Sequence, residues 1–229
     1  MAVIKYLGHG AFDIKLIGLD SEEKRVLIDP WLENPFSPVK VTDYCGVKIN
    51  YIVITHDHGD HLGNAIELSN LTRGVIVGVY ELADRLRTQG VEAIGGNVGG
   101  ALSVDDLFIA LTPAVHSSLS GIPTGVVIGG SEARIYHSGD TGLFGDMALI
   151  GELYSPDVAL LPIGGHFTMG VKEAVKAVQL LRPKIAIPMH YNTFPLIRAD
   201  PEEFRKLVET LTSTKVVTLK PGESLTYPA

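Results

Sequence analysis

The feature that most constrains the fold of this chain is a cluster of metal-binding side chains directly after a short apolar run. Residues 51–55 are apolar and β-branched, which predicts a strand, and they lead straight into HDHGDH at positions 56–61. On an extended or tightly turned backbone, His56 and His58 face one side, while Asp60 and His61 reach a second point nearby. This spacing favours two adjacent cations at the end of a strand over a polar surface loop.

The rest of the chain predicts an α/β fold. Three strand patterns without a helical period come first and indicate an antiparallel start, at residues 2–7, 12–19 and 25–28. Six further strand patterns alternate with helical patterns, at residues 75–79, 107–111, 126–128, 134–137, 158–161 and 185–188. Residues 30–47 contain three prolines and little periodicity, so we expect a long loop there.

Two helices have clear sequence signals. In residues 171–181 the apolar side chains recur at helical spacing, with Lys172, Glu173 and Lys176 on the opposite face. A second helix is predicted after Asp200, which is a suitable N-cap, with Pro201 at the first helical position. Glu203 lies at the capping-box position. No linker or low-complexity segment divides the chain, so we expect residues 1–229 to form a single domain.

Composition excludes several classes of protein. Asp and Glu outnumber Lys and Arg by 26 to 19 and the basic residues do not cluster, so nonspecific nucleic-acid binding is disfavoured. Cys45 is the only cysteine and has no internal partner, which fits a reducing compartment. The N-terminus has a strand pattern in place of a signal peptide, and no apolar run approaches a membrane span of about 18 residues. We therefore expect a cytoplasmic protein without membrane segments.

Three more metal-type residues follow predicted strands. His116 comes after the strand at 107–111, Asp140 lies in HSGDT at 137–141, and His190 lies in PMHYN at 188–192. With the HDHGDH run, this set resembles the five sequence motifs of the metallo-β-lactamase superfamily, in the order found there. The motifs GHGAF at 8–12, THDHGDH at 55–61 and GGHFTM at 164–169 are similar to those of the UPF0173 metal-dependent hydrolases within it. Members of that small family also resemble the L-ascorbate-6-phosphate lactonase.

The resemblance implies a fold and a set of ligands. The fold is a four-layer αβ/βα sandwich in which two similar halves pack sheet against sheet. Asp29, after the strand at 25–28, matches a structural carboxylate that orients the histidine loop. The remaining matches are His56, His58 and His116 for one ion, Asp60, His61 and His190 for a second, and Asp140 as the bridging carboxylate.

Two divalent ions held in this way can activate water. Metal coordination lowers the pKa of water from about 15.7 to about 7, and the same ions polarise a carbonyl or phosphoryl oxygen. Imidazoles with carboxylates suit zinc, manganese or iron, and zinc is our first expectation. A further acid is needed for the leaving group, and His166 follows a strand in a glycine-rich turn. We predict Asp60 and His166 as catalytic residues, with Asp60 also a metal ligand.

Several residues have more than one interpretation from sequence. His9 is either structural or active on substrate, and His137 either hydrogen-bonds a ligand or takes part in the chemistry. Trp31, Phe36 and Tyr44 lie in the long loop, where aromatic side chains either cover the core or line a substrate pocket. Local sequence does not separate these alternatives.

The predicted function is hydrolysis of a small ester, lactone or phosphodiester. One alternative is a di-iron redox protein on the same scaffold. Two features argue against it: such proteins carry glutamate at the position of His58, and this chain has no flavin domain. The other is a non-catalytic metal-binding scaffold, which the presence of all seven presumed ligands disfavours. The expected partner is a small-molecule substrate, and the chain is compatible with a homo-oligomer.

Overall fold

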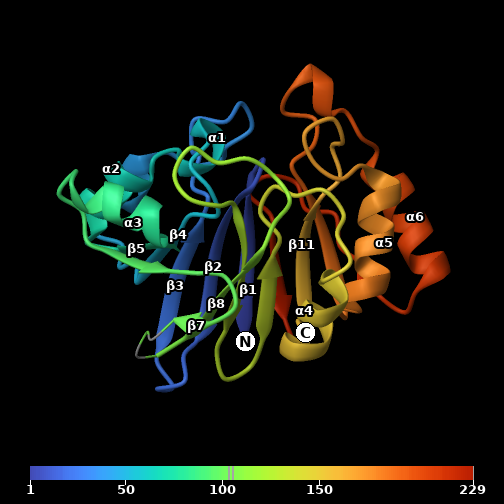
Figure 1. The fold of residues 1–229 in the computed structure, drawn as a ribbon, viewed down its shortest axis with the longest axis horizontal. Helices are drawn as coiled ribbons and strands as arrows, with labels where there is room; N and C mark the ends of the chain where they lie inside the picture. The colour runs from blue at the N-terminus through green and yellow to red at the C-terminus, as the bar shows by residue number, and fades with distance from the viewer. Residues whose placement is uncertain (103, 105, 229) are drawn as a thin grey trace.

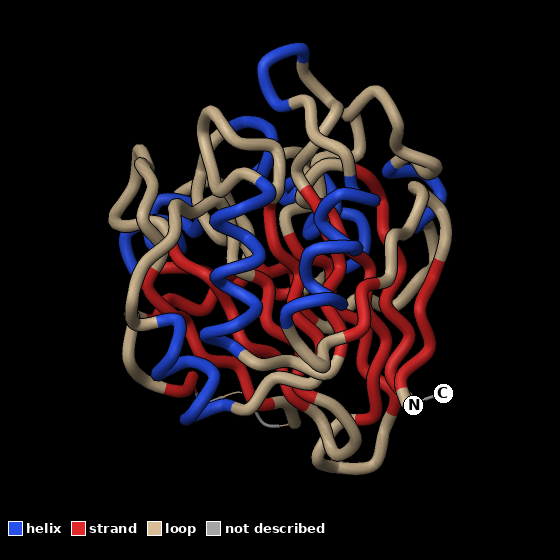
Figure 2. Tube along the Cα trace, turned by 90° about the vertical axis from the view of Figure 1, so that its right-hand side faces the viewer, coloured by secondary structure: helices blue, strands red, loops and turns tan. Residues whose placement is uncertain are grey.

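The computed structural model describes residues 1–102, 104 and 106–228, and its centre is a pair of seven-stranded sheets. The first sheet has the order β14-β1-β2-β3-β4-β5-β6. Its strands are β1 (Ala2–Gly8), β2 (Ala11–Ile17), β3 (Glu23–Ile28), β4 (Tyr51–Val53), β5 (Val75–Val79), β6 (Ala93–Gly96) and β14 (Ser224–Tyr227). Strand β14 pairs with β1, so the two ends of the chain lie close together (Figure 2).

The second sheet has the order β13-β12-β11-β10-β9-β8-β7. Its strands are β7 (Ala101–Leu102), β8 (Phe108–Pro113), β9 (Thr124–Gly129), β10 (Arg134–His137), β11 (Val158–Pro162), β12 (Ile185–Met189) and β13 (Lys215–Val216). Each sheet has three antiparallel pairings followed by three parallel ones. This repeated pattern confirms the two similar halves.

Among the described residues, five α-helices cover the outer faces of the two sheets, and the short α1 (Gly59–Leu62) lies at their upper edge (Figure 1). On the first sheet lie α2 (Ala65–Thr72) and α3 (Tyr80–Arg87), and on the second lie α4 (Met147–Tyr154), α5 (Val171–Leu181) and α6 (Pro201–Leu211). Short 3-10 turns occur at Val41–Tyr44 (η1) and Pro195–Ile197 (η2). Within the residues described, no helix is long and apolar enough to cross a membrane.

Three apolar clusters hold the layers together. Between the sheets, Ile14 and Val26 of the first pack with Val126 and Ile187 of the second. Each outer cluster joins one sheet to its helices, as Val178 of α5 does on the second sheet. Because every sheet face is covered, the strands are almost continuously apolar, which explains their clear sequence signal. The predicted four-layer αβ/βα sandwich is confirmed.

Helix signals were uneven along the chain. The helix predicted at 171–181 is α5, and α6 begins at Pro201 after the N-cap Asp200. The carboxylate of Asp200 accepts the backbone N–H of Glu202, and not that of Glu203 as the capping-box prediction required. Residues 30–47 form the expected loop, with η1 as its one helical turn.

The topology brings several loops to one edge of the molecule. Strands β3, β4 and β5 are parallel in the first sheet, and β10, β11 and β12 are parallel in the second. The loops that follow these strands gather at the top of Figure 1, around α1. Ligand sites in α/β sheets form beyond the carboxyl ends of parallel strands, so this is the edge at which to look for a functional site.

Candidate metal centre

The seven metal-type residues predicted from sequence meet at this edge. Four follow β4 and enter α1, while His116 follows β8, Asp140 follows β10 and His190 follows β12. Six of the seven, all but Asp140, lie in two groups in which the potential ligand atoms are within 4.8 Å of one another, and a third such group, of Asp29, His56 and His61, connects the two. The open group is His56, His58 and His116, and the buried group is Asp60, His61 and His190, joined by His9.

Asp140 lies between the two groups. Its Oδ2 atom is 3.0 Å from Nε2 of His190 and 3.3 Å from Nε2 of His61, in the buried group. The same oxygen is 3.6 Å from Nε2 of His116, in the open group. Burial opposes ionisation of Asp140, but His61 and His190 outweigh it and hold its pKa well below the usual range. A charged carboxylate therefore faces both sets of histidines.

The histidines of the open group point toward a common space. Nε2 of His56 is 3.0 Å from Nδ1 of His58, and the other ring nitrogen of His56 lies 3.1 Å from the hydroxyl of Thr55. Burial lowers the pKa of His56 to about 3, and burial also lowers the pKa of His116. Both rings are consequently neutral at physiological pH, which is the state that binds a metal ion.

Asp29 orients His61 in the buried group. Its Oδ1 accepts the backbone N–H of Thr55 at 2.8 Å, and its Oδ2 accepts the Thr55 hydroxyl at 2.6 Å. The same Oδ2 lies 2.8 Å from Nδ1 of His61. Because an ionised carboxylate only accepts hydrogen bonds, Nδ1 carries a proton. Burial lowers the pKa of His61, but Asp140 and Asp29 outweigh it and raise the pKa well above its usual range, so a bound metal ion would take the place of a proton on Nε2, which faces Asp140. Asp29 thus has the orienting contact that the sequence resemblance implied.

Buried polar atoms test whether a metal fits here. Nδ1 of His190 and Oδ1 of Asp140 have no hydrogen-bond partner among the described residues, and Nε2 of His61 and of His190 lie near Oδ2 of Asp140 without an aligned hydrogen bond. Buried polar atoms almost always have partners, and a cation beside Asp140 would supply one to the carboxylate and to one nitrogen of each ring. Imidazole nitrogens with carboxylate oxygens are a suitable donor set for zinc or a similar divalent ion. The residues present therefore fit metal ions.

His9 positions Asp60, a role that the sequence did not reveal. Its Nε2 lies 3.0 Å from Oδ2 of Asp60, and its Nδ1 lies 2.5 Å from the hydroxyl of Thr193. Burial lowers the pKa of His9 to about 4, so the ring is neutral. The carboxylate requires a proton on Nε2, which leaves Nδ1 to accept from Thr193. The Oδ2 atom of Asp60 is held in this way, while its Oδ1 atom remains able to bind a metal ion.

His137 forms hydrogen bonds with the backbone and, among the described residues, with no metal-type side chain, so the predicted hydrogen bond to a metal ligand is not found. The ring is fully buried, with Nε2 at 2.9 Å from the carbonyl oxygen of Gly10 and Nδ1 accepting the N–H of Gly139 at 3.0 Å. Both ring nitrogens are thereby occupied, and burial lowers the pKa of the ring. His137 fixes the turn from which Asp140 projects.

Three residues of the centre have left-handed backbone, with φ of 56° at His9, 45° at Asp29 and 54° at His190. Non-glycine residues adopt this conformation at a cost of about 1–3 kcal/mol, and such positions cluster at functional sites. Gly164 makes one of them possible, because a Cβ atom there would lie 2.3 Å from the carbonyl oxygen of His190. The glycine permits close backbone packing under the site.

Asp57, inside the histidine run, anchors the β8–β9 loop. Its Oδ1 accepts the backbone N–H of Leu119 at 2.7 Å and the hydroxyl of Ser118 at 2.8 Å, and its Oδ2 accepts from Arg85 at 2.8 Å. Burial would raise the pKa of Asp57, but hydrogen bonds from Ser120, Leu119 and Ser118 bring it down to about 2. No local sequence pattern indicates this role, because all of these partners are distant along the chain.

A pocket of about 350 Å³ opens over the centre. Its lining includes His58, Asp60, His116, Asp140 and His190, together with Ser117, Phe167 and Phe194. The predicted catalytic residue His166 is exposed and is not among the lining residues, although its ring packs edge-on against Phe167 at 4.4 Å. No described residue hydrogen-bonds to the ring of His166.

The three aromatic residues of the long loop have different surroundings. Trp31 stacks on Phe194 at 5.8 Å and so supports the pocket wall. Phe36 borders a separate pocket of about 200 Å³. Tyr44 is buried in the first outer cluster and donates its hydroxyl to Asp13 at 3.0 Å. Of the three, only Trp31 contributes to the pocket over the metal-type residues.

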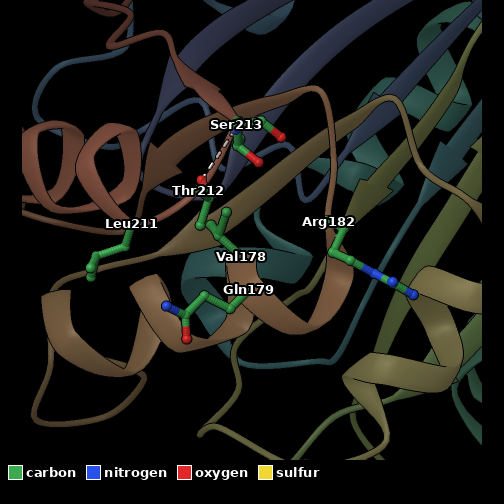
Figure 3. A pocket seen from close by; sticks show the side chains of 7 residues that line it. Val178, Gln179, Arg182, Leu211, Thr212 and Ser213 are labelled. Carbon is green, nitrogen blue, oxygen red and sulfur yellow. Dashed lines mark hydrogen bonds between the residues drawn. The ribbon is translucent and has the colours of Figure 1, made fainter.

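Another pocket of about 350 Å³ lies between the carboxyl ends of α5 and α6 (Figure 3). It is lined by Val178, Gln179, Arg182, Leu211, Thr212, Ser213 and Thr214. The backbone N–H of Thr214 donates to the hydroxyl of Thr212 at 3.1 Å. This pocket has no histidine or carboxylate among its lining residues, and it shares none of them with the pocket over the metal centre.

The sandwich and its histidine and aspartate centre are those of the metallo-β-lactamase superfamily, and a beta-lactamase superfamily domain model matches residues 24–191. The chain belongs to the UPF0173 metal-dependent hydrolase family of that superfamily. A UPF0173 metal-dependent hydrolase of Staphylothermus marinus is 69% identical over 228 residues, and one of Thermofilum pendens is 64% identical over 228 residues. Each alignment covers 100% of both chains.

A solved structure agrees with this assignment. Igni18, named as a novel metallo hydrolase from the hyperthermophilic archaeon Ignicoccus hospitalis, is 45% identical with a TM-score of 0.92. The match covers 98% of this chain and 97% of that one. Family and fold together establish a metal-dependent hydrolase.

Proposed function

We propose that this protein hydrolyses a small ester, lactone or phosphodiester with hydroxide activated between two divalent ions. The observation that carries the proposal is the position of Asp140, whose Oδ2 lies within 3.6 Å of Nε2 in His61, His116 and His190. A carboxylate shared by two ligand groups is the arrangement expected of a dinuclear centre. When bound, the two ions supply hydroxide at neutral pH and polarise the scissile carbonyl or phosphoryl group.

Each group has its own task in this proposal. The open group, His56, His58 and His116, holds one ion beside the pocket. The buried group holds the second through Asp60, His61 and His190, with Asp140 bridging. Asp29 keeps the proton of His61 on Nδ1, and His9 keeps Asp60 in place. Zinc is the proposed metal, with manganese or iron compatible with the same donor set.

His166 is the proposed proton donor to the leaving group. Its support is its position beside Phe167, which lines the pocket, and a ring that no described residue hydrogen-bonds. A positioned acid contributes about 10²- to 10⁴-fold in rate. His166→Ala should lose turnover on that scale and keep its metal, and the loss should shrink for nitrophenyl esters, whose leaving group departs without a proton. Unchanged rates on alkyl substrates would show that the ring is structural.

Metal content together with turnover tests the main proposal. Metal-replete protein should contain two ions per chain and hydrolyse at least one class among generic esters, lactones and bis-phosphate esters. One ion per chain would exclude the dinuclear centre. Two bound irons with oxygen consumption would support the redox alternative, and bound metal without turnover on any class would support a non-catalytic scaffold.

A further inference from the structure

We infer that the site selects substrates with an apolar group next to the reacting bond and no negative charge beyond that of the reacting group itself. The inference rests on the proposed hydrolysis and narrows it to one kind of substrate. It excludes compounds that carry a separate phosphate or carboxylate.

The first observation is the aromatic wall of the pocket, formed by Phe167 and Phe194. Both line the same pocket as the metal-type residues. Phe167 is 49% exposed, and Phe194 is half-buried with its ring stacked on Trp31. Exposed aromatic side chains next to a polar centre provide an apolar surface that a substrate group can cover.

The loops that carry the pocket residues are apolar at the surface. Leu119, two positions after Ser117, is 83% exposed, and Leu196, two positions after Phe194, is 60% exposed. Val115, beside His116, is exposed as well. These side chains add exposed apolar surface to the loops that carry the pocket residues, which is typical of regions that bind ligands.

The second observation is the absence of a cation for a second anionic group. None of the described residues that line the pocket is Lys or Arg. Arg85 approaches the β8–β9 loop from α3, but its guanidinium donates to Asp57 at 2.8 Å and to Ser120 at 2.8 Å. An additional phosphate would lose its hydration against Phe167 and Phe194 without gaining a partner.

The net charge of the proposed metal centre limits how many negative charges the substrate can carry. If two divalent ions are bound, the charges of Asp60, Asp140 and one hydroxide would leave the centre with a single net positive charge. That charge matches one negative charge, either the one developing on an ester or lactone carbonyl or the one on a phosphodiester. A second anion on the substrate has nothing left to neutralise it.

Binding of alkyl hydroxamates to the metal-loaded protein tests the wall without any need for turnover. The hydroxamate group binds the metal, so acetohydroxamate, butyrohydroxamate and octanohydroxamate differ only in the apolar chain. We expect the dissociation constant, measured by calorimetry, to fall about two- to fourfold per added methylene until the wall is covered. A dissociation constant that is independent of chain length would overturn the inference.

Turnover tests the charge limit. The comparison is kcat/KM for a neutral lactone and for the same lactone carrying a phosphate at a remote hydroxyl. We expect the phosphorylated compound to react at least about tenfold more slowly, since its second charge enters an apolar wall. Equal or faster reaction of the phosphorylated lactone would overturn the inference.

Variants test whether the preference for apolar substrates comes from the aromatic side chains of the pocket. Phe167→Ala should reduce the chain-length dependence of hydroxamate binding, whereas Phe36→Ala, at a side chain of 50% exposure that borders the other pocket, should leave it unchanged. Phe167→Arg should raise kcat/KM for the phosphorylated lactone relative to the neutral one. If Phe36→Ala has the same effect as Phe167→Ala, the wall has been misplaced.

The results separate this inference from the proposed function. Turnover of an ester or lactone with no dependence on chain length or charge leaves hydrolysis intact and refutes the inference alone. Hydroxamate binding that tightens with chain length, without turnover of any ester, lactone or phosphodiester, supports the apolar wall and refutes the proposed reaction.

Discussion

The open group and the buried group use similar ligands in different surroundings. His58 and His116 of the open group are half-buried and line the pocket, and the nearest hydroxyl to Nε2 of His58 is that of Ser117 at 3.5 Å. In the buried group, His61 and His190 are almost inaccessible to solvent, although Asp60 and one side of His190 also border the pocket. Here Asp29 fixes the ring of His61, while His9 and Thr193 fix Asp60.

The difference suggests that one group of ligands serves mainly to retain a metal ion and the other mainly to expose one to the substrate. Ligands whose orientation is fixed by neighbouring hydrogen bonds bind metal more tightly than ligands free to rotate, because less order must be imposed on binding. We expect the buried group to hold its ion more tightly and to release it more slowly. We expect the open group to exchange its ion faster and to present it to the substrate.

The largest expected effect comes from Asp140, which the two groups share. Asp140→Ala should release both ions and lower turnover by about 10³-fold or more, because two close cations then lack the carboxylate between them. Metal analysis after dialysis, together with kcat, measures the loss. Asp146→Ala, at an exposed position on the same loop, is the matched control and should keep both properties. Full activity in the Asp140 variant would mean that the groups share no bridge.

Asp29→Asn should affect the buried group more than the open group, which Asp29 reaches only through the Thr55 hydroxyl beside Nδ1 of His56. An amide NH₂ facing Nδ1 of His61 favours a proton on Nε2, the nitrogen that would bind the metal ion. We expect one ion to bind about 10- to 100-fold more weakly while the other is retained, as judged by titration with a chromogenic chelator.

The control for this change is Asp13→Asn, another buried carboxylate, whose partners are Arg25 and Tyr44. It should lower stability and leave both metal affinities unchanged. Equal weakening of both ions by Asp29→Asn would remove the distinction between the groups.

A smaller effect is expected from Thr193, at the outer end of the hydrogen bonds that hold Asp60. Thr193→Val removes the hydroxyl that donates to His9, a bond worth about 0.5–1.5 kcal/mol. The affinity of the buried-group ion should fall about two- to tenfold in a competition titration. Thr193→Ser keeps the hydroxyl and should restore the affinity, whereas a deficit shared by both variants would point to packing of the methyl group.

The smallest effect concerns Asp57, beside the open group. Its pKa of about 2 in the folded protein is below the ordinary value of 3.8, so the unfolded chain binds its proton first as the pH falls. Stability from this group is complete above about pH 4 and is lost as the pH falls toward 2. We expect about 1 kcal/mol, allowing for screening of the half-exposed Arg85.

Denaturant titration of metal-free protein tests this difference. Between pH 4 and 2, the stability gap between the parent and Asp57→Asn should close as the pH falls. A gap that stays constant over this range would show that the charge of Asp57 does not anchor the loop.

The metal-type residues could be predicted because their signal is local. Four lie within one short run, and the other three each follow a predicted strand. The roles of His9 and Asp57 could not, since their partners are far along the chain: His9 and Thr193 are 184 positions apart. Residue type gave no hint that Trp31 supports the pocket while Tyr44 packs in the core.

The secondary-structure elements likewise divide into those that the sequence predicts and those that it does not. Strands and α5 have regular apolar patterns that result from burial on the sheets. Helices α2, α3 and α4 have eight residues each, and strands β7 and β13 have two. Elements of this length have too few positions to establish a period, and the surrounding fold determines their conformation.

The contact between His9 and Thr193 also bears on how the protein reaches its native state. Joining positions 184 apart requires closure of a loop that includes most of both sheets, and contacts of this kind form late in folding. We therefore expect docking of the two halves to precede correct placement of Asp60. A metal ion proposed for the buried group would then be taken up only by the folded chain, and its uptake would report the last step of assembly.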